Sequence, residues 1–90
     1  MKHITVKISG KVQGVFFRYW TKKEADKLNI CGWVRNELDG SVLIEAEGED
    51  KNLHEFCMLC ENGSKGAIVE TIDVKWNENK KGYKKFEIKH

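Results

Sequence analysis

Long apolar runs are absent from this 90-residue sequence. A membrane-spanning helix needs about 20 consecutive apolar residues, and no stretch approaches that length. The N-terminal residues alternate between apolar and polar side chains, where a signal peptide would have an apolar block. We therefore expect a soluble protein that remains in the compartment where it is made and has no membrane partner.

Cysteine is also scarce, and the sequence has only Cys31, Cys57 and Cys60. An odd number does not complete a disulfide framework, and the last two cysteines lie in a stretch with a helical pattern. Free thiols are typical of proteins in reducing compartments. The cysteine content therefore predicts a cytoplasmic protein without disulfide bonds.

Internal repeats, linkers and low-complexity tracts are absent as well. A chain of 90 residues can form one hydrophobic core, so we expect residues 1–90 to fold as a single domain and, by default, as a monomer. The composition, 40% hydrophobic and 33% charged, is that of an ordinary globular protein. The formal net charge of +2 favours anions weakly and does not by itself indicate nucleic-acid binding.

The first half of the sequence has the pattern of a strand, a helix and a hairpin. Apolar and polar side chains alternate in residues 3–12, which predicts a half-buried strand. From Arg18 the apolar period becomes helical. Residues 30–36 and 41–47 are predicted strands, and Asp39-Gly40 between them is a hairpin turn signal.

The second half predicts one more helix and two more strands. Glu49 or Asp50 is the predicted cap of a helix that runs through Asn62, and Gly63 is expected to end it. The remaining predicted elements are a strand at 68–76, a turn at 77–82 and a short last strand at 86–88.

The order of these elements is β-α-β-β-α-β plus a short C-terminal strand. It favours the α+β class, as a ferredoxin-like α/β sandwich with two helices on one face of a mainly antiparallel sheet. Strands joined through a helix run parallel, so the first two strands should end on the same edge of the sheet. The loop after Val12 would then lie roughly 10 Å from Asn36, with one strand between them.

The loop between the first strand and the first helix has the features of an anion site. Free amides at a helix N-terminus and the helix dipole both favour negative charge. Here Arg18 begins the helix and the first acidic residue is Glu24, an arrangement that opposes the dipole by about 0.3–1 kcal/mol. A bound phosphate would make the arrangement favourable, because each charge-assisted hydrogen bond contributes about 1.5–3 kcal/mol. The alternative is a solvated arginine, with Gly14 serving only as a turn glycine.

Several motifs and residue types are absent from the loop, and their absence limits the reactions that it could catalyse. It has neither the Gly-Lys-Ser/Thr ending of a nucleotide-binding loop nor, at the strand ends, a pair of carboxylates for magnesium. It also has no Cys, Ser, Thr, Asp or His that could become phosphorylated. Direct attack by water on a bound phosphoryl group remains. Because no general acid stands nearby, the leaving group should have a low pKa, as a carboxylate does at about 4, and this favours acyl phosphates over phosphate esters.

Two blocks of the sequence resemble a known family. Residues 10–18, Gly-Lys-Val-Gln-Gly-Val-Phe-Phe-Arg, are similar to the first signature of the acylphosphatases. Residues 32–36, Gly-Trp-Val-Arg-Asn, with Asp-Gly-Ser-Val at 39–42, are similar to the second. The resemblance extends over essentially the whole chain. It implies hydrolysis of acyl phosphates to a carboxylate and inorganic phosphate, without metal or cofactor.

The resemblance also implies a role for each site residue. Arg18 would bind the phosphoryl oxygens together with backbone amides of residues 13 to 18. Asn36 would hold the attacking water, and the substrate's own phosphate would accept its proton. Without the resemblance, Asn36 would be interpreted as an ordinary turn residue.

The remaining members of the predicted substrate-binding loop share a structural role. Gln13 is expected to support the loop and Phe17 to pack in the core, and the other members are Gly14, Val15 and Phe16. Two positions depart from the family pattern. Ser64 follows Gly63 where relatives commonly have proline, and His90 replaces the usual C-terminal aromatic residue. We expect both departures to lie away from the site and to affect stability more than activity.

Rival interpretations of two segments are less favoured. His54, Cys57 and Cys60 have helical spacing that spreads them over about a third of the helix circumference, and both cysteines fall on the apolar stripe, so we predict no metal site. RNA-recognition domains share this element order but stack bases on aromatic residues of two central strands. The corresponding strands here have no aromatic residue, and Glu45 and Glu47 are expected to be exposed there.

Two further alternatives concern the basic run at 80–85 and the loop itself. The run is interpreted as a solvated turn, so we predict no nucleic-acid partner. A non-catalytic anion-sensing module on the same fold would keep the Arg18 loop but would not need Asn36.

Overall fold

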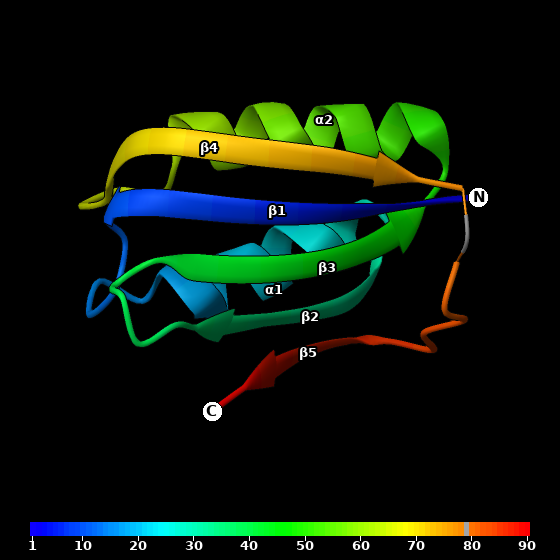
Figure 1. Cartoon of the computed structure of the whole chain (residues 1–90). Helices are drawn as coiled ribbons and strands as arrows, with labels where there is room; N and C mark the ends of the chain where they lie inside the picture. The colour runs from blue at the N-terminus through cyan, green and yellow to red at the C-terminus, as the bar shows by residue number, and fades with distance from the viewer. Residues whose placement is uncertain (79) are drawn as a thin grey trace.

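The computed structural model describes residues 1–78 and 80–90. Two helices and five strands follow one another along the chain (Figure 1). Their bounds are β1 Lys2–Lys11, α1 Phe17–Lys27, β2 Cys31–Asn36, β3 Val42–Gly48, α2 Asp50–Asn62, β4 Ile68–Asn77 and β5 Phe86–Lys89. These bounds confirm the predicted elements to within about a residue. The predicted turn at 77–82 includes residue 79, which lies outside the described residues.

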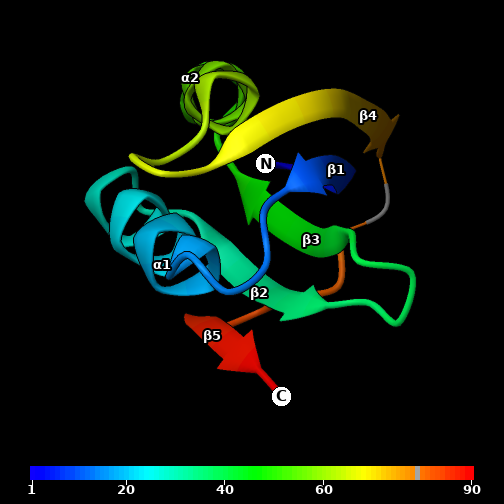
Figure 2. The same ribbon diagram turned by 90° about the vertical axis from the view of Figure 1, so that its left-hand side faces the viewer.

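The strands form one sheet in the order β4-β1-β3-β2-β5. All neighbouring pairs are antiparallel except β2 and β5, which are parallel. Both helices lie on the same face of this sheet (Figure 2). The predicted ferredoxin-like α+β sandwich is therefore confirmed. Neither helix in the described part of the chain has the length and apolar character of a membrane-spanning segment.

The core lies between the sheet and the two helices. The alternating positions of the central strands are completely buried there, and the helices contribute Phe17, Ala25, Leu53 and Phe56. Each buried Val, Leu, Ile or Phe side chain of this core contributes about 1.5–3 kcal/mol through its removal from water. The strand members of this set are Ile4, Val6, Ile8, Val34, Val42, Ile44 and Ala46. The core therefore fixes the orientation of α1 relative to the sheet.

Three strands end at one edge of the sheet. The strand β1 is antiparallel to β3, β3 is antiparallel to β2, and β2 is parallel to β5. The C-terminal ends of β1, β2 and β5 consequently lie at the same end of the sheet, on the left in Figure 1. The expectation that the loop after β1 and the residue Asn36 lie near one another, separated by a single strand, is confirmed by this topology.

The last residues of β1 are turned by a bulge. The register between β1 and β4 shifts between Ser9 and Gly10, and such irregularities re-aim the chain that follows. Gly10 has φ 131°, and a Cβ atom at this position would meet the carbonyl oxygen of Ile68. Only glycine therefore fits where β1 leads into the loop.

A buried carboxylate that the sequence did not indicate lies at the opposite end of the strands. Glu47 is only 2% exposed, so the expectation that it faces solvent is wrong. Its Oε2 lies 2.8 Å from Nδ1 of His3, and the other ring nitrogen of His3 contacts Glu45. The backbone N–H groups of Lys81 and Gly82 donate to the Glu47 carboxylate, the latter at 2.9 Å. Polar partners thus compensate for the burial of the charge.

These bonds tie the segment that leads into β5 to the central strand β3. The N–H of Tyr83 also donates to Glu47, at 3.2 Å. The lysine side chains of 80–85 are exposed, as expected for a solvated turn, but the backbone of the turn is bound. Burial by itself would raise the pKa of Glu47, but the hydrogen bonds from Lys81, His3, Gly82 and Tyr83 outweigh it and hold the pKa below the ordinary 4.5.

The substitution Glu47→Gln tests this anchor. A group whose folded-state pKa is lowered stabilises the fold fully above its unfolded pKa of about 4.5, and this contribution is lost as the pH falls through the folded value. We expect the variant to lose about 1.5–3 kcal/mol of unfolding free energy at neutral pH. The difference from the wild type should shrink in acid, as measured by urea unfolding across the pH range.

The control is Glu55→Gln, on the exposed surface of α2, which should change stability by no more than about 0.5 kcal/mol. A stability difference between wild type and Glu47→Gln that is the same at neutral and acid pH would contradict the role given to the Glu47 charge.

Candidate active site

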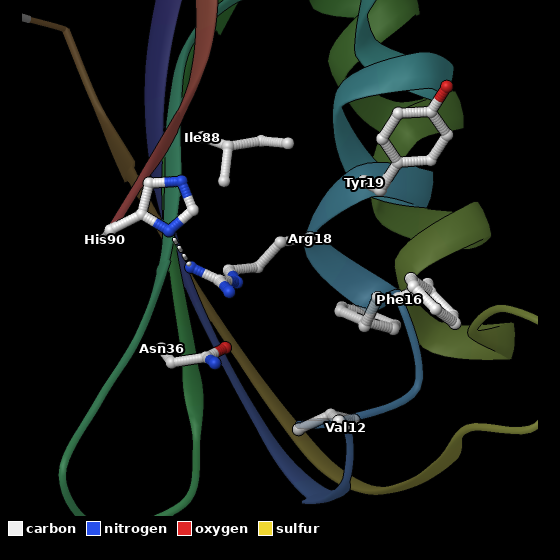
Figure 3. A pocket seen from close by; sticks show the side chains of 9 residues that line it. Val12, Phe16, Arg18, Tyr19, Asn36, Ile88 and His90 are labelled. Carbon is white, nitrogen blue, oxygen red and sulfur yellow. Dashed lines mark hydrogen bonds between the residues drawn. The ribbon is translucent and has the colours of Figure 1, made fainter.

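A cavity of about 350 Å³ opens where the three strand ends meet the N-terminus of α1. Arg18 crosses it from the helix side, and Asn36 and His90 face it from the sheet side (Figure 3). The lining residues are Val12, Gly14, Phe16, Phe17, Arg18, Tyr19, Asn36, Ile88 and His90. The cavity therefore combines polar groups from three elements with an apolar wall.

The structure brings together most of the predicted site residues. Besides Arg18 and Asn36, the loop residues Gly14, Phe16 and Phe17 line the cavity. The side chains of Gln13 and Val15 do not line it. Val15 packs partly against the core, and Gln13 points to the turn after β2. Both residues remain in the loop between β1 and α1.

Gln13 fastens the loop to the neighbouring hairpin. Its Nε2 donates to the carbonyl oxygen of Glu37 at 2.9 Å and to that of Ser41 at 2.8 Å. These two residues flank the β2–β3 turn, which begins directly after Asn36. The two bonds join the loop to this turn, and they couple the position of the loop to that of Asn36.

The backbone of the loop leaves its donors unoccupied. The N–H groups of residues 13 to 19 donate to no other group in the described ranges 1–78 and 80–90, and the first bond of this region runs from Trp20 N to Phe16 O. No side chain of residues 1–78 or 80–90 caps the helix, and its first turn has no acidic residue. Consecutive free amides at a helix N-terminus are suited to an anion.

Phe16 is in an unusual conformation at the start of α1. Its φ is 60° and its ψ is 25°, in the left-handed region, and the residue is 86% exposed. Non-glycine residues in this region are uncommon, and such strain costs about 1–3 kcal/mol. The following residue, Phe17, is buried and accepts a hydrogen bond through its carbonyl from Thr21 Oγ1 at 2.8 Å. The strain thus lies at the junction between the loop and α1, within the stretch of free amides.

Arg18 carries the positive charge of the cavity. Its Nη1 donates to the carbonyl oxygen of Lys89 at 2.9 Å and lies 3.3 Å from Nδ1 of His90. No carboxylate of residues 1–78 or 80–90 forms an ion pair with it. The partners of the guanidinium are therefore polar groups that leave its charge unneutralised.

Asn36 is exposed at the C-terminal end of β2. Its side chain makes no hydrogen bond with any residue that the structure describes, and it is directed toward the cavity (Figure 3). Hydrogen bonds hold the turn that follows, because Glu37 N donates to Ser41 O at 2.8 Å and Asp39 Oδ1 accepts from both the N–H and the hydroxyl of Ser41. The side-chain and backbone hydrogen bonds from Ser41 hold the pKa of Asp39 below its usual range.

His90 corrects an expectation from the sequence. The residue was expected to lie away from the site, but it lines the cavity and contacts Arg18. The cause is the parallel pairing of β5 with β2, which brings the end of β5 to the same edge as Asn36. The position of Ser64, the other departure from the family pattern, is outside the cavity lining.

Sequence reasoning also missed Val12, Tyr19 and Ile88, which line the cavity. Tyr19 follows Arg18 directly on the first helical turn, so its proximity could have been inferred. Ile88 and His90 were not recognisable, because a short last strand has no pattern that fixes its partner or direction.

The rival metal site on α2 has unfavourable chemistry. Burial raises the pKa of the Cys57 thiol to about 11, and Cys60 is completely buried with a pKa raised by the same cause. Metals bind the thiolate form, which these positions disfavour. His54 instead contacts the ring of Trp76, at 4.7 Å between centroids.

Comparisons with known proteins give consistent results. A family model described as Acylphosphatase matches residues 4–88. An acylphosphatase of Oceanobacillus iheyensis is 50% identical over 91 residues, which cover 100% of this chain and 100% of the relative. Among solved structures, the acylphosphatase from Bacillus subtilis has 39% identity and a TM-score of 0.98, with 100% of both chains covered. An acylphosphatase from Coxiella burnetii has 33% identity and a TM-score of 0.93, with coverage of 98% of this chain and 92% of the other.

The substitution Gln13→Ala tests the tie between the loop and the hairpin. It removes two hydrogen bonds, each worth about 0.5–1.5 kcal/mol, so the unfolding free energy should fall by about 1–3 kcal/mol in urea unfolding. Asn52→Ala, on α2, is a control that should change stability by no more than about 0.5 kcal/mol. Equal stability of the two variants would show that the Gln13 bonds contribute nothing.

Proposed function

The chain belongs to the acylphosphatase family of acyl phosphate hydrolases, and we propose that its 13–18 loop, Arg18 and Asn36 carry out this hydrolysis. The observation that supports the proposal most directly is the unneutralised guanidinium beside a row of free amides. A phosphoryl dianion matches both groups in charge and in hydrogen-bonding capacity.

In this proposal the loop amides and Arg18 bind the phosphoryl oxygens. A guanidinium can donate two parallel hydrogen bonds to adjacent oxygens, and it would exchange its carbonyl partner, Lys89, for the substrate. Negative charge on these oxygens is then stabilised by donors that are already oriented, which is the usual source of a large rate effect. The strained backbone of Phe16 supports this reading, since it positions the amides before any ligand arrives.

The second part of the proposal is that Asn36 orients the attacking water. Its side-chain amide has both a donor and an acceptor, has no partner among the described residues, and faces the same cavity as Arg18. The water oxygen forms a bond to phosphorus as the bond from phosphorus to the acyl oxygen breaks. The carboxylate leaves without protonation, and a proton of the water passes to a phosphoryl oxygen, giving inorganic phosphate.

We also propose that the reaction needs neither metal nor cofactor. The phosphoryl charge would be compensated by the loop amides and Arg18, and the low pKa of a carboxylate, about 4, removes the need for a general acid. A monomer in the reducing cytoplasm completes the proposal, and the three free cysteines support the choice of compartment.

Arg18→Lys tests the phosphoryl-binding role. Lysine keeps the charge but loses the planar pair of donors, so kcat/KM for a small acyl phosphate should fall by about 10²–10³-fold. The chain offers a matched control in Arg35→Lys, because Arg35 stacks on Trp33 at 4.8 Å and binds Glu37, outside the cavity lining. This control should retain near wild-type activity.

The assay is run with and without a chelator. Activity that persists in chelator, together with competitive inhibition by inorganic phosphate, is the expected result. Wild-type activity in Arg18→Lys, or activity that disappears on chelation, would overturn the corresponding part of the proposal.

Asn36→Ala separates water positioning from binding. Loss of the amide should lower kcat by about 10²-fold or more, whereas the inhibition constant of inorganic phosphate should stay within about twofold of wild type, since phosphate contacts the loop and Arg18. An equal loss of phosphate binding and turnover would remove Asn36 from the water-positioning role. Unchanged turnover would favour the non-catalytic anion-sensing alternative for this residue.

A further inference from the structure

His90 has a geometry that the mechanism above does not use. It follows β5, lines the cavity, and places its Nδ1 at 3.3 Å from Nη1 of Arg18 (Figure 3). The same nitrogen of Arg18 donates to Lys89 O at 2.9 Å. An imidazole is therefore in direct contact with the guanidinium proposed to bind the phosphoryl group.

The contact calls for an acceptor on the imidazole. A guanidinium has donors only, so a hydrogen bond at this 3.3 Å contact needs an acceptor, which the neutral ring supplies at Nδ1 when its proton is on Nε2. The neutral imidazole thus helps to hold the guanidinium against β5. A second proton at Nδ1 would turn the acceptor into a donor and place two positive charges side by side.

Among the described residues that line the cavity, no second charged side chain would mask this change. From α1 it is faced by Arg18 and by the phenol of Tyr19, and from β2 by the uncharged Asn36. Lys89 and Arg35 are paired in the strand register, but both charged groups lie 4.8 Å from the ring of Trp33, which is outside the cavity lining. Within the described residues, the guanidinium is the one charged group that lines the cavity with His90.

We propose that His90 is a second, pH-dependent ligand of the phosphoryl group: the neutral ring holds Arg18 in the empty cavity, and the protonated ring donates to the bound dianion beside it. An oxyanion between the two cations accepts a hydrogen bond from each and removes their repulsion. Protonation of the ring and anion binding consequently favour one another. This inference rests on the proposed function, because it assigns a further ligand to the same site.

Sulfate is the probe, because it resembles the phosphoryl dianion and stays a dianion in the range of about pH 5 to 8 where imidazoles titrate. Its dissociation constant is measured by isothermal titration calorimetry at about pH 5.5 and about pH 8 for the wild type, His90→Gln and His54→Gln. Glutamine retains an acceptor for Arg18 but does not titrate. His54 is exposed on α2, so its variant is the matched control.

Wild type and His54→Gln should bind sulfate about fivefold more tightly at the lower pH, as expected of one exposed charge pair, and His90→Gln should bind it equally at both. A pH dependence that survives in His90→Gln, or an equal loss of affinity at both pH values, would overturn the inference. Hydrolysis of an acyl phosphate that sulfate inhibits in all three proteins would then leave the proposed function standing. Absence of both hydrolysis and sulfate binding in the wild type would overturn the two together.

Discussion

An arginine at the N-terminus of a helix, without a carboxylate partner among the residues that the structure describes, is the constraint on which the rest of this site depends. The helix dipole and the free amides of the loop add further positive potential where Arg18 already places a charge. The fold sustains this unfavourable arrangement because α1 is anchored independently, through buried Phe17 and Ala25. An anion is the component that would convert the repulsion into attraction, and a phosphoryl dianion brings two negative charges to the site.

The sheet topology brings the other groups to this charge. With β3 between β1 and β2, and β5 parallel to β2, three strands deliver their C-terminal ends to one edge. The loop follows β1, Asn36 ends β2 and His90 follows β5, so each group is supported by a strand with a buried face. Gln13 joins the loop to the hairpin. At the opposite end of the strands, Glu47 binds the backbone of the segment that leads into β5. The geometry of the site therefore depends on bonds at both ends of the sheet.

Local patterns in the sequence predicted the helices, the strands and part of the site. Alternation and helical periodicity defined the elements, and the connection through a helix required β1 and β2 to be parallel. Arg18 was evident because it places a positive charge at a helix N-terminus. Asn36 needed the family resemblance, because an asparagine before a turn is common. His90 and Glu47 could not be predicted. The role of His90 follows from the pairing of the short strand β5 with β2. The role of Glu47 follows from its hydrogen bonds to the segment before β5. Both are long-range contacts that the local sequence does not specify.

The central claim is that the loop amides and Arg18 form the anion site, and its most direct test is a titration of the ¹⁵N-labelled protein with inorganic phosphate, followed by NMR. The account predicts that the largest saturable shifts occur at the amides of residues 13–18 and at the guanidinium of Arg18. Phosphate binding with shifts confined to another region, such as the basic run at 80–85, would contradict it.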